Sequence, residues 1–291
     1  MNGSKKKKLR GVKHKVHEEK TRERNIGLAL SVTVLIVILC ISGIIINSML
    51  NQPSASQTFN STSKTRAAIV DHLSLTRPNQ TFIETATNIL KQAGYTVDYY
   101  PGDEVTVNFY GSLPTHGYGL IIFRVHSSAR QMQGEEIVKS DVSLFTSELY
   151  STSKYIQQQL DGQVVSVKYL HGEETLYFGI RPGFIMSNGN FHNTTIIMMG
   201  CDGLMTTSMA ETFTEKGAKA YIGWDDSILG TRNDPAITHL LQHLITEKQT
   251  INNATANTMT EFPPTPTDYS MLRYYPLKAG TQRIENIKSD G

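Results

Sequence analysis

LIIFRVHSS, from Leu120 to Ser128, and TIIMMGCDGL, from Thr195 to Leu204, are the two stretches that decide the fold. Each is a run of apolar, strand-forming residues that ends in one reactive side chain, His126 in the first and Cys201 in the second. Near-continuous hydrophobicity is typical of a strand buried inside a parallel sheet. In open α/β sheets, ligands bind beyond the carboxyl ends of the strands. If the two strands are neighbours, His126 and Cys201 lie together at the functional edge.

A cysteine beside a histidine can act as a nucleophile with its general base. The thiolate is the reactive form, and a histidine within hydrogen-bond reach is the usual means of producing it near neutral pH. The alternative is structural, because a single buried cysteine is more often an inert small hydrophobe. Gly200 before the cysteine and the small polar residues after the histidine favour the catalytic interpretation.

This pattern resembles the caspase-like cysteine peptidases, which include caspases, metacaspases, legumain, clostripain and the gingipains. In those enzymes one apolar strand ends in His-Gly or His-Ser, and a later one ends in a small residue followed by the catalytic Cys. His126-Ser127 and Gly200-Cys201 match residue by residue, and Ser208 to Trp224 is similar to the helix, turn and strand after the nucleophile. The resemblance spans Ala67 to about Glu247. It implies an α/β fold, a caspase-like three-layer sandwich with a mostly parallel central sheet.

The resemblance also implies site residues and an activity, a cysteine endopeptidase (a hydrolase of peptide or protein substrates) with catalytic His126 and Cys201 and no cofactor. The oxyanion hole would use the backbone N–H groups of Cys201 and Ser127, although Ser127 stands where a glycine is common. The primary pocket would be lined by Asp71, Trp224, Asp225 and Asp226, and acidic residues there would favour Arg or Lys in the substrate. Alternatively these aspartates cap turns and Trp224 packs in the core.

The amino-terminal part of the chain predicts a membrane anchor. Ile26 to Ile46 is uncharged and rich in Ile, Leu and Val, about the length that crosses a bilayer, so we expect a transmembrane helix over residues 26–48. A cleaved signal peptide would need a shorter apolar core and a small-residue cleavage site, which is poorly supplied here. The anchor would make the lipid bilayer a partner of the chain.

Charge asymmetry sets the expected orientation. Residues 1–25 hold ten Lys or Arg against three Glu, and the next basic residue is Lys64. This predicts a single-pass cell-membrane protein with a cytoplasmic amino terminus and its carboxyl-terminal domain outside. A basic tail that binds nucleic acid is the alternative. From Ile26 onward the chain has 18 basic and 23 acidic residues, so we expect no nucleic-acid partner for the outer domain.

The remaining chain divides into a tether and one domain. Residues 49–65 are rich in Ser, Thr, Asn and Gln and predict a flexible tether. Residues 66–291 predict the extracytoplasmic domain, with an insertion at about 129–193. Cys40 lies in the anchor, so no disulfide can form within this domain. Four glycosylation candidates follow the anchor, at Asn60, Asn79, Asn193 and Asn253.

Within the domain, strand and helix patterns alternate. Residues 67–71 and 95–100 predict strands around a helix with Thr81 as a possible N-cap and Gly94 as its stop, a parallel β-α-β unit. His116-Gly117 precedes the histidine strand and so should lie at the opposite sheet edge. Later patterns predict helices at 205–216 and 234–248, a strand at 218–223 and an edge strand at 271–277. His239 and His243 lie one helical turn apart, but no further ligand is evident, so we expect no metal site.

A second function class stays open. A membrane-tethered binding or scaffolding domain could keep the caspase-like fold without turnover, because fold does not imply function. Two features favour this alternative. Ser127 stands where the family commonly has a glycine, and the insertion is long. Iodoacetamide alkylation of Cys201 across pH separates the two, since an unactivated thiol reacts only above about pH 8.5.

Overall fold

The structure, a computed structural model, describes residues 66–133, 136–169 and 174–284. The expected basic tail at 1–25, anchor at 26–48, tether at 49–65 and Asn60 lie outside these described residues. No helix in the described ranges is both long enough and apolar enough to span a bilayer.

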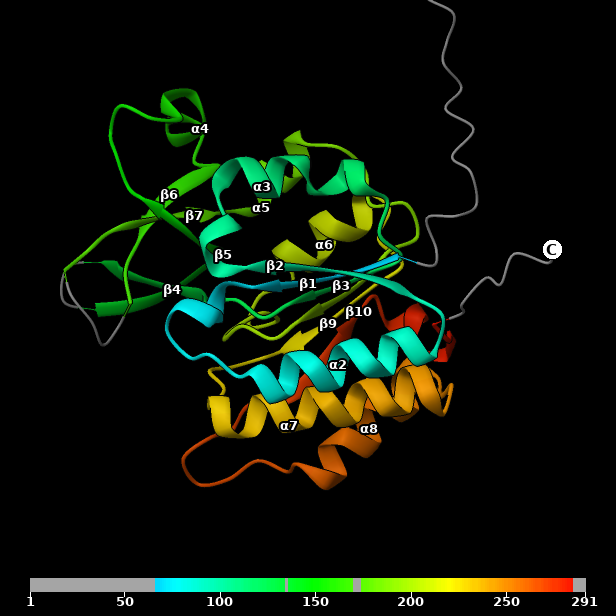
Figure 1. The fold of residues 1–291 in the computed structure, drawn as a ribbon. Helices are drawn as coiled ribbons and strands as arrows, with labels where there is room; N and C mark the ends of the chain where they lie inside the picture. Colours follow the sequence, from blue (N-terminus) through cyan, green and yellow to red (C-terminus); the bar gives the residue numbers. More distant parts are fainter. Residues whose placement is uncertain (1–65, 134–135, 170–173, 285–291) are drawn as a thin grey trace, which may run out of the picture. The chain divides into compact units, whose positions relative to one another are not determined.

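In the described part of the chain, six strands form the central sheet in the order β10-β9-β8-β3-β1-β2 (Figure 1). The strands are β1 (Arg66–Asp71), β2 (Thr96–Pro101), β3 (Leu120–Phe123), β8 (Thr195–Met198), β9 (Ala220–Trp224) and β10 (Leu272–Tyr275). All neighbours pair in parallel except β9 and the edge strand β10, which are antiparallel. The expected α/β class with a mostly parallel sheet is confirmed.

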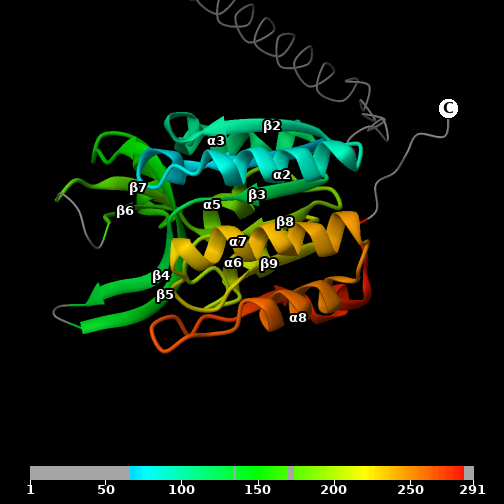
Figure 2. The same ribbon diagram turned by 60° about the horizontal axis from the view of Figure 1, so that its bottom comes forward.

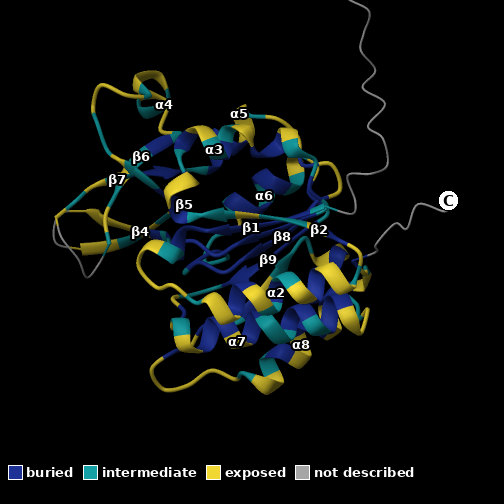
Figure 3. Ribbon diagram, viewed as in Figure 1, coloured by how far each residue is buried: buried dark blue, intermediate teal, exposed yellow. Residues whose placement is uncertain are grey.

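Helices cover both faces of this sheet (Figures 1 and 2). One face carries α2 (Gln80–Gln92), α7 (Gly230–Leu241) and α8 (Ile251–Glu261), and the other carries α3 (Val107–Ser112), α5 (Pro182–Ser187) and α6 (Ser208–Glu215). Successive strand residues point to opposite faces, so Ile69 joins the apolar cluster under α2 while Val70 joins the cluster under α6. The central strands are therefore buried on both sides (Figure 3).

The stretch between β3 and β8 builds a second, antiparallel sheet in the order β4-β5-β7-β6. Its strands are β4 (Ser127–Gln133), β5 (Glu136–Leu149), β6 (Val164–Val167) and β7 (Tyr177–Ile180), with α4 (Ile156–Leu160) between β5 and β6. Leu144, Phe178 and Ile180 are buried in the same cluster as α3, α5 and α6. The second sheet therefore shares a core with the central sheet.

Some element boundaries differ from the sequence expectation. The N-cap of α2 is Asn79, whose side chain accepts from the Phe82 N–H at 3.1 Å, and not Thr81. Gly94 does follow this helix, in the left-handed conformation with φ of 89°. Helix α7 begins at Gly230, four residues before Asp234. The sequence did not predict helix α8, because its apolar residues are widely spaced among Thr and Asn.

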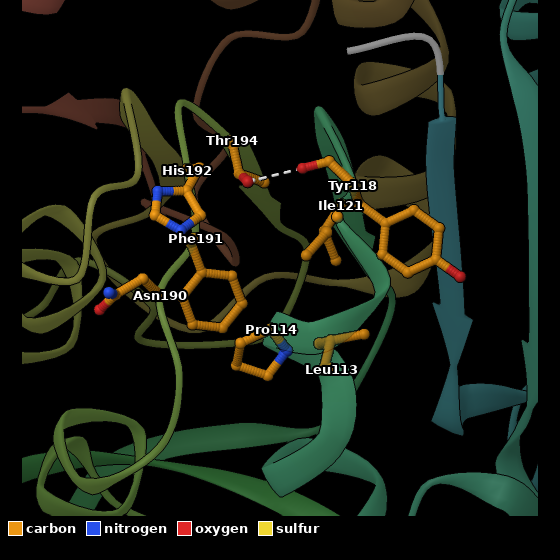
Figure 4. Close-up of a pocket in the computed structure, with 9 residues that line it drawn as sticks. Leu113, Pro114, Tyr118, Ile121, Asn190, Phe191, His192 and Thr194 are labelled. Atoms are coloured by element: carbon orange, nitrogen blue, oxygen red, sulfur yellow. Dashed lines mark hydrogen bonds between the residues drawn. The ribbon is translucent and has the colours of Figure 1, made fainter. Parts of the chain in front are cut away.

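The amino ends of β3 and β8 form the edge remote from the expected site. The η4 turn (Leu113–His116) precedes β3 there, as expected for His116-Gly117. A cavity of about 10 Å³ lies beside it (Figure 4). The Thr194 hydroxyl donates to the Tyr118 carbonyl at 2.6 Å across one side of this cavity. Such a volume holds at most about one water molecule, so it is not a substrate site.

Candidate functional site

His126 and Cys201 each follow one of two paired strands at the carboxyl edge of the central sheet. Strands β3 and β8 pair in parallel with Phe123 opposite Met198, and each reactive residue follows three positions later. The pairing continues beyond the strands, because the Met199 N–H donates to the Phe123 carbonyl at 2.8 Å. The Ser127 hydroxyl then donates to the Cys201 carbonyl at 2.5 Å. Register alone therefore brings together the two residues that the sequence singled out.

Gly200 permits this close approach of the two chain segments. A Cβ at position 200 would lie 2.6 Å from Met198 Cε and 2.7 Å from the Val125 carbonyl oxygen, and it would also overlap the Ser127 hydroxyl. A backbone oxygen cannot move aside as a flexible side chain can. A glycine before the cysteine is thus a steric requirement of the β3–β8 contact.

The His126 imidazole is enclosed by groups from two other segments, the one after β1 and the one after β6. Its Nε2 lies 2.9 Å from the Thr76 hydroxyl, and its ring centroid lies 4.8 Å from that of Tyr169 and 5.8 Å from that of His72. Burial lowers the pKa of His126 to about 3, and the nearby positive charge of Arg77 acts in the same direction. Within the described residues Nδ1 has no hydrogen-bond partner, so this nitrogen is the one available to a substrate or a thiol.

The Cys201 thiol is half-buried and is covered by the main chain of Ile228. The Ile228 N–H lies 3.5 Å from Sγ, and Sγ lies 3.8 Å from the Ile228 carbonyl oxygen. Burial raises the pKa of Cys201, the Ile228 main chain and Arg77 lower it, and the carboxylates of Asp202 and Asp268 raise it. No hydrogen bond joins Cys201 to His126 in the described part of the chain. At neutral pH this geometry holds an uncharged thiol and an uncharged imidazole.

The turn that carries the cysteine is clamped by the base of the β4–β5 hairpin. Asp202 is in the left-handed conformation with φ of 60°. Its carboxylate accepts from the Ala129 N–H at 3.2 Å and from Arg130 Nε at 3.1 Å, and Arg130 also pairs with Asp226. The expected insertion therefore contributes directly to the position of Cys201.

The residues expected to line an acidic pocket are engaged elsewhere. Asp71 is buried against Arg124 Nη1 at 2.7 Å. Asp225 accepts from the Met271 N–H at 2.7 Å and from Arg273 at 3.1 Å, and Asp226 pairs with Arg130. Trp224 is fully buried, with its indole N–H donating to Asn233 at 2.9 Å.

The two backbone groups expected to form an oxyanion hole have different surroundings. The Cys201 N–H donates to no acceptor among the described residues, so it is available for an oxyanion. Ser127 pairs with Leu144 in the β4–β5 ladder, and its hydroxyl donates a hydrogen bond to the Cys201 carbonyl. The buried position of Ser127 makes its side chain a structural clamp on the turn.

Four neighbours of the dyad were missed by sequence reasoning. They are His72, Thr76 and Arg77, from the segment after β1, and Tyr169, from the end of β6. Because β1 pairs with β3, the rule that sites form beyond parallel strand ends could have indicated the first three. Tyr169 has no such signal, since its contact with His126 depends on how the second sheet folds back.

The glycosylation candidates within the described residues, and the histidine pair considered for a metal, have the following surroundings. Asn79 uses its amide to bond Asp234 at 2.8 Å, whereas Asn193 and Asn253 are exposed. His239 and His243 both contact the carboxylate of Glu261. No group of three potential metal ligands occurs within residues 66–133, 136–169 and 174–284.

A scan against protein-family models finds no match for this chain, and a search of curated proteins finds none either.

Proposed function

We propose that this protein is a caspase-like cysteine endopeptidase that cleaves peptide bonds with Cys201 and His126. The observation that supports this most directly is the β3–β8 register, which ends with Phe123 opposite Met198, three positions before His126 and Cys201. Two further features agree with it. The His126 Nδ1 is unoccupied in the described structure, and the Cys201 N–H faces no internal acceptor.

The chemistry requires the substrate to displace the Ile228 main chain from the sulfur. His126 Nδ1 then accepts the thiol proton as Sγ bonds to the substrate carbonyl carbon, and the carbonyl electrons move onto the oxygen. The Cys201 N–H stabilises that oxyanion, a contribution of about 3 kcal/mol when well aimed. Collapse breaks the C–N bond, and the amine leaves with the proton from His126. Water hydrolyses the thioester, which releases the acid and restores the thiol.

A second candidate is a binding or scaffolding domain without turnover. It is favoured by the covered sulfur, the raised pKa of Cys201 and the missing hydrogen bond between Cys201 and His126. In that case Cys201 is an ordinary buried thiol. The peptidase differs from this binding domain in one requirement. A bound substrate must move the Ile228 main chain away from the Cys201 sulfur.

Reporter cleavage by the full-length chain, purified in detergent, tests the proposal. Peptide reporters that end in acidic, basic and neutral residues should include at least one that wild type cleaves and Cys201→Ala does not. Iodoacetamide alkylation of Cys201 should slow in His126→Ala at pH 7. No cleavage of any reporter, together with alkylation that is unaffected by His126→Ala and appears only above about pH 8.5, would favour the scaffold.

We also propose that residues 26–48 anchor the domain to the cell membrane and that residues 66–291 lie outside. The apolar run and the basic residues before it support this orientation. Externally added protease on intact cells should digest the carboxyl-terminal domain and leave the amino-terminal tail protected. Protection of the whole chain would contradict the proposal.

A further inference from the structure

A cleft of about 500 Å³ lies between helices α3, α4 and α5. Its lining residues come from these helices and their flanking turns, so the cleft is separate from the sheet edge that carries His126 and Cys201. The volume is within the range of sites that bind small ligands. Among the described residues that line it, none is charged. Most of the lining consists of neutral amides and hydroxyls, from Asn108, Ser112, Gln158, Gln163, Ser187 and Asn188.

Three of these groups are oxygen atoms that are already oriented by hydrogen bonds. The Asn188 amide N–H donates to the Phe184 carbonyl at 2.6 Å, and its amide oxygen would lie 3.3 Å from a Cβ placed on Gly111. The Ser112 and Ser187 hydroxyls donate to main-chain carbonyls of their own helices, at 3.0 and 2.9 Å. An oxygen with two lone pairs can still accept a hydrogen bond from a ligand. The cleft therefore presents acceptors whose directions are set before a ligand arrives.

The amides of Asn108, Gln158 and Gln163 supply both donors and acceptors. In the described part of the chain these three side chains form no hydrogen bond within the protein. The main chain beneath two of them is fixed, because the Gln158 carbonyl accepts from the Gln163 N–H at 2.8 Å and the Gln163 carbonyl accepts from the Arg181 N–H at 2.9 Å. An amide side chain donates and accepts, and so does each hydroxyl of a sugar.

Tyr155 forms an aromatic wall of the cleft in a strained conformation. Its φ of 51° is in the left-handed region, which is uncommon for a bulky residue. Its hydroxyl donates to Glu148 at 3.0 Å, and its ring packs edge-on against Phe178 with 5.2 Å between the centroids. Strain of this kind persists only where the surroundings hold it, and it is concentrated at ligand sites. The ring is half-buried, so part of its apolar surface is open to a ligand.

We propose that this cleft binds a neutral oligosaccharide, whose hydroxyls bond the amides and serines and whose C–H groups pack on Tyr155. An anionic ligand would lack the Arg or Lys that it needs, and an apolar ligand would leave the amides unpaired. A bound peptide strand would need a sheet edge along the cleft, whereas these walls are helices. The proposal concerns a second site and does not depend on the peptidase function.

Calorimetric titration of the full-length chain tests the proposal, in a detergent whose headgroup is not a sugar. The probes are maltopentaose, cellopentaose and penta-N-acetylchitopentaose, and a capped Gly-Ser pentapeptide represents a neutral peptide ligand. At least one glycan should bind with a Kd of about 1 mM or tighter. Added salt should not weaken this binding, because no charge lines the cleft. Cys201→Ala should bind the glycan as wild type does, since the thiol is not part of the cleft.

Gln158→Met and Gln163→Met remove an amide and keep a side chain of similar length. Each should weaken glycan binding about two- to tenfold, the effect of one lost neutral hydrogen bond. The matched control is Gln92→Met, an exposed glutamine at the end of α2, which covers the other face of the central sheet (Figure 1). This control should bind the glycan as tightly as wild type.

Three outcomes overturn the proposal. These are no binding of any of the three glycans, tighter binding of the capped peptide than of every glycan, and equal affinities for the Gln158→Met, Gln163→Met and Gln92→Met variants. Circular dichroism and the melting temperature establish that each variant is folded. If neither cleft variant folds, Asn108→Ala replaces them, because Asn108 is exposed and its side chain has no hydrogen-bond partner within the described residues. Unchanged glycan affinity in Asn108→Ala would then overturn the proposal.

Discussion

At the scale of single residues, Gly200 carries the tightest constraint at the site. Gly200→Ala places a methyl group against the Val125 carbonyl and Met198, so one of the two strand extensions must shift. We expect a loss of roughly 1–3 kcal/mol in the free energy of unfolding, as in other overpacked positions. Urea denaturation measures it.

The control is Gly183→Ala, in helix α5, where the nearest atom to the added methyl group is Gln163 Cγ at 3.4 Å. Alanine is favoured over glycine inside a helix, so this variant should be as stable as wild type or more so. If both alanine variants behave alike, the close approach around Gly200 does not constrain the turn.

His72 makes the stability of the protein depend on pH. Burial lowers its pKa from 6.5 to about 4, so between these values the unfolded chain binds a proton that the folded chain does not. His72 therefore costs no stability above about pH 6.5, and it lowers the free energy of unfolding increasingly as the pH falls toward 4. The largest loss in the free energy of unfolding that His72 causes, reached below about pH 4, is about 3 kcal/mol.

His72→Gln should lose less stability than wild type between pH 6.5 and 4, measured by urea denaturation at each pH. His126, whose pKa is lowered to about 3, still titrates in both proteins. Equal losses in His72→Gln and wild type would mean that His72 is not held uncharged in the fold.

At the scale of elements, Arg124 ties β1, β3 and α7 together beneath the site. Its guanidinium bonds Asp71 at 2.7 Å and Asp234 at 2.8 and 3.0 Å, and all three side chains are buried. Arg124→Met leaves two buried carboxylates without a cation, which should lower the free energy of unfolding by about 3–5 kcal/mol.

The matched control is Arg273→Met on the edge strand β10. Arg273 pairs with Asp225 at 3.1 Å but is 58% exposed, so its loss should cost less than about 1 kcal/mol. Urea unfolding of both variants gives the comparison. Similar losses would show that burial of the Arg124 network adds nothing to the stability of the fold.

The elements also show what the sequence can and cannot predict. The strands before His126 and Cys201 were predictable because a buried parallel strand has an uninterrupted apolar run. The surroundings of Asp71 were not predictable, because its partner Arg124 lies 53 positions away along the chain, and Arg124 in turn bonds Asp234, which is 110 positions further on. Helix α5 opens with Pro182 at its first position, where the missing N–H costs no hydrogen bond within the helix. The Tyr169 contact depends on the fold of a second sheet, which no local pattern encodes.

At the scale of the whole molecule, the two sheets should unfold together. Phe178, in β7 of the second sheet, is fully buried in the cluster that also holds Val70 and Phe123 of the central sheet. Phe178→Ala should therefore destabilise the whole domain by about 3–5 kcal/mol, the usual cost of a large cavity. If the second sheet folded independently, Phe178→Ala would destabilise that sheet and leave the central sheet as stable as in wild type.

Trp224 is the probe that separates these outcomes. It is the single tryptophan of the chain, and it lies in the other apolar cluster, under α7. In Phe178→Ala, the urea midpoint from Trp224 fluorescence should fall together with the midpoint from far-ultraviolet circular dichroism. An unchanged fluorescence midpoint with an earlier loss of circular dichroism would mean that the second sheet is an independent unit. Coincident midpoints follow from a shared core, because the buried face of the second sheet is completed by side chains of β1 and β3.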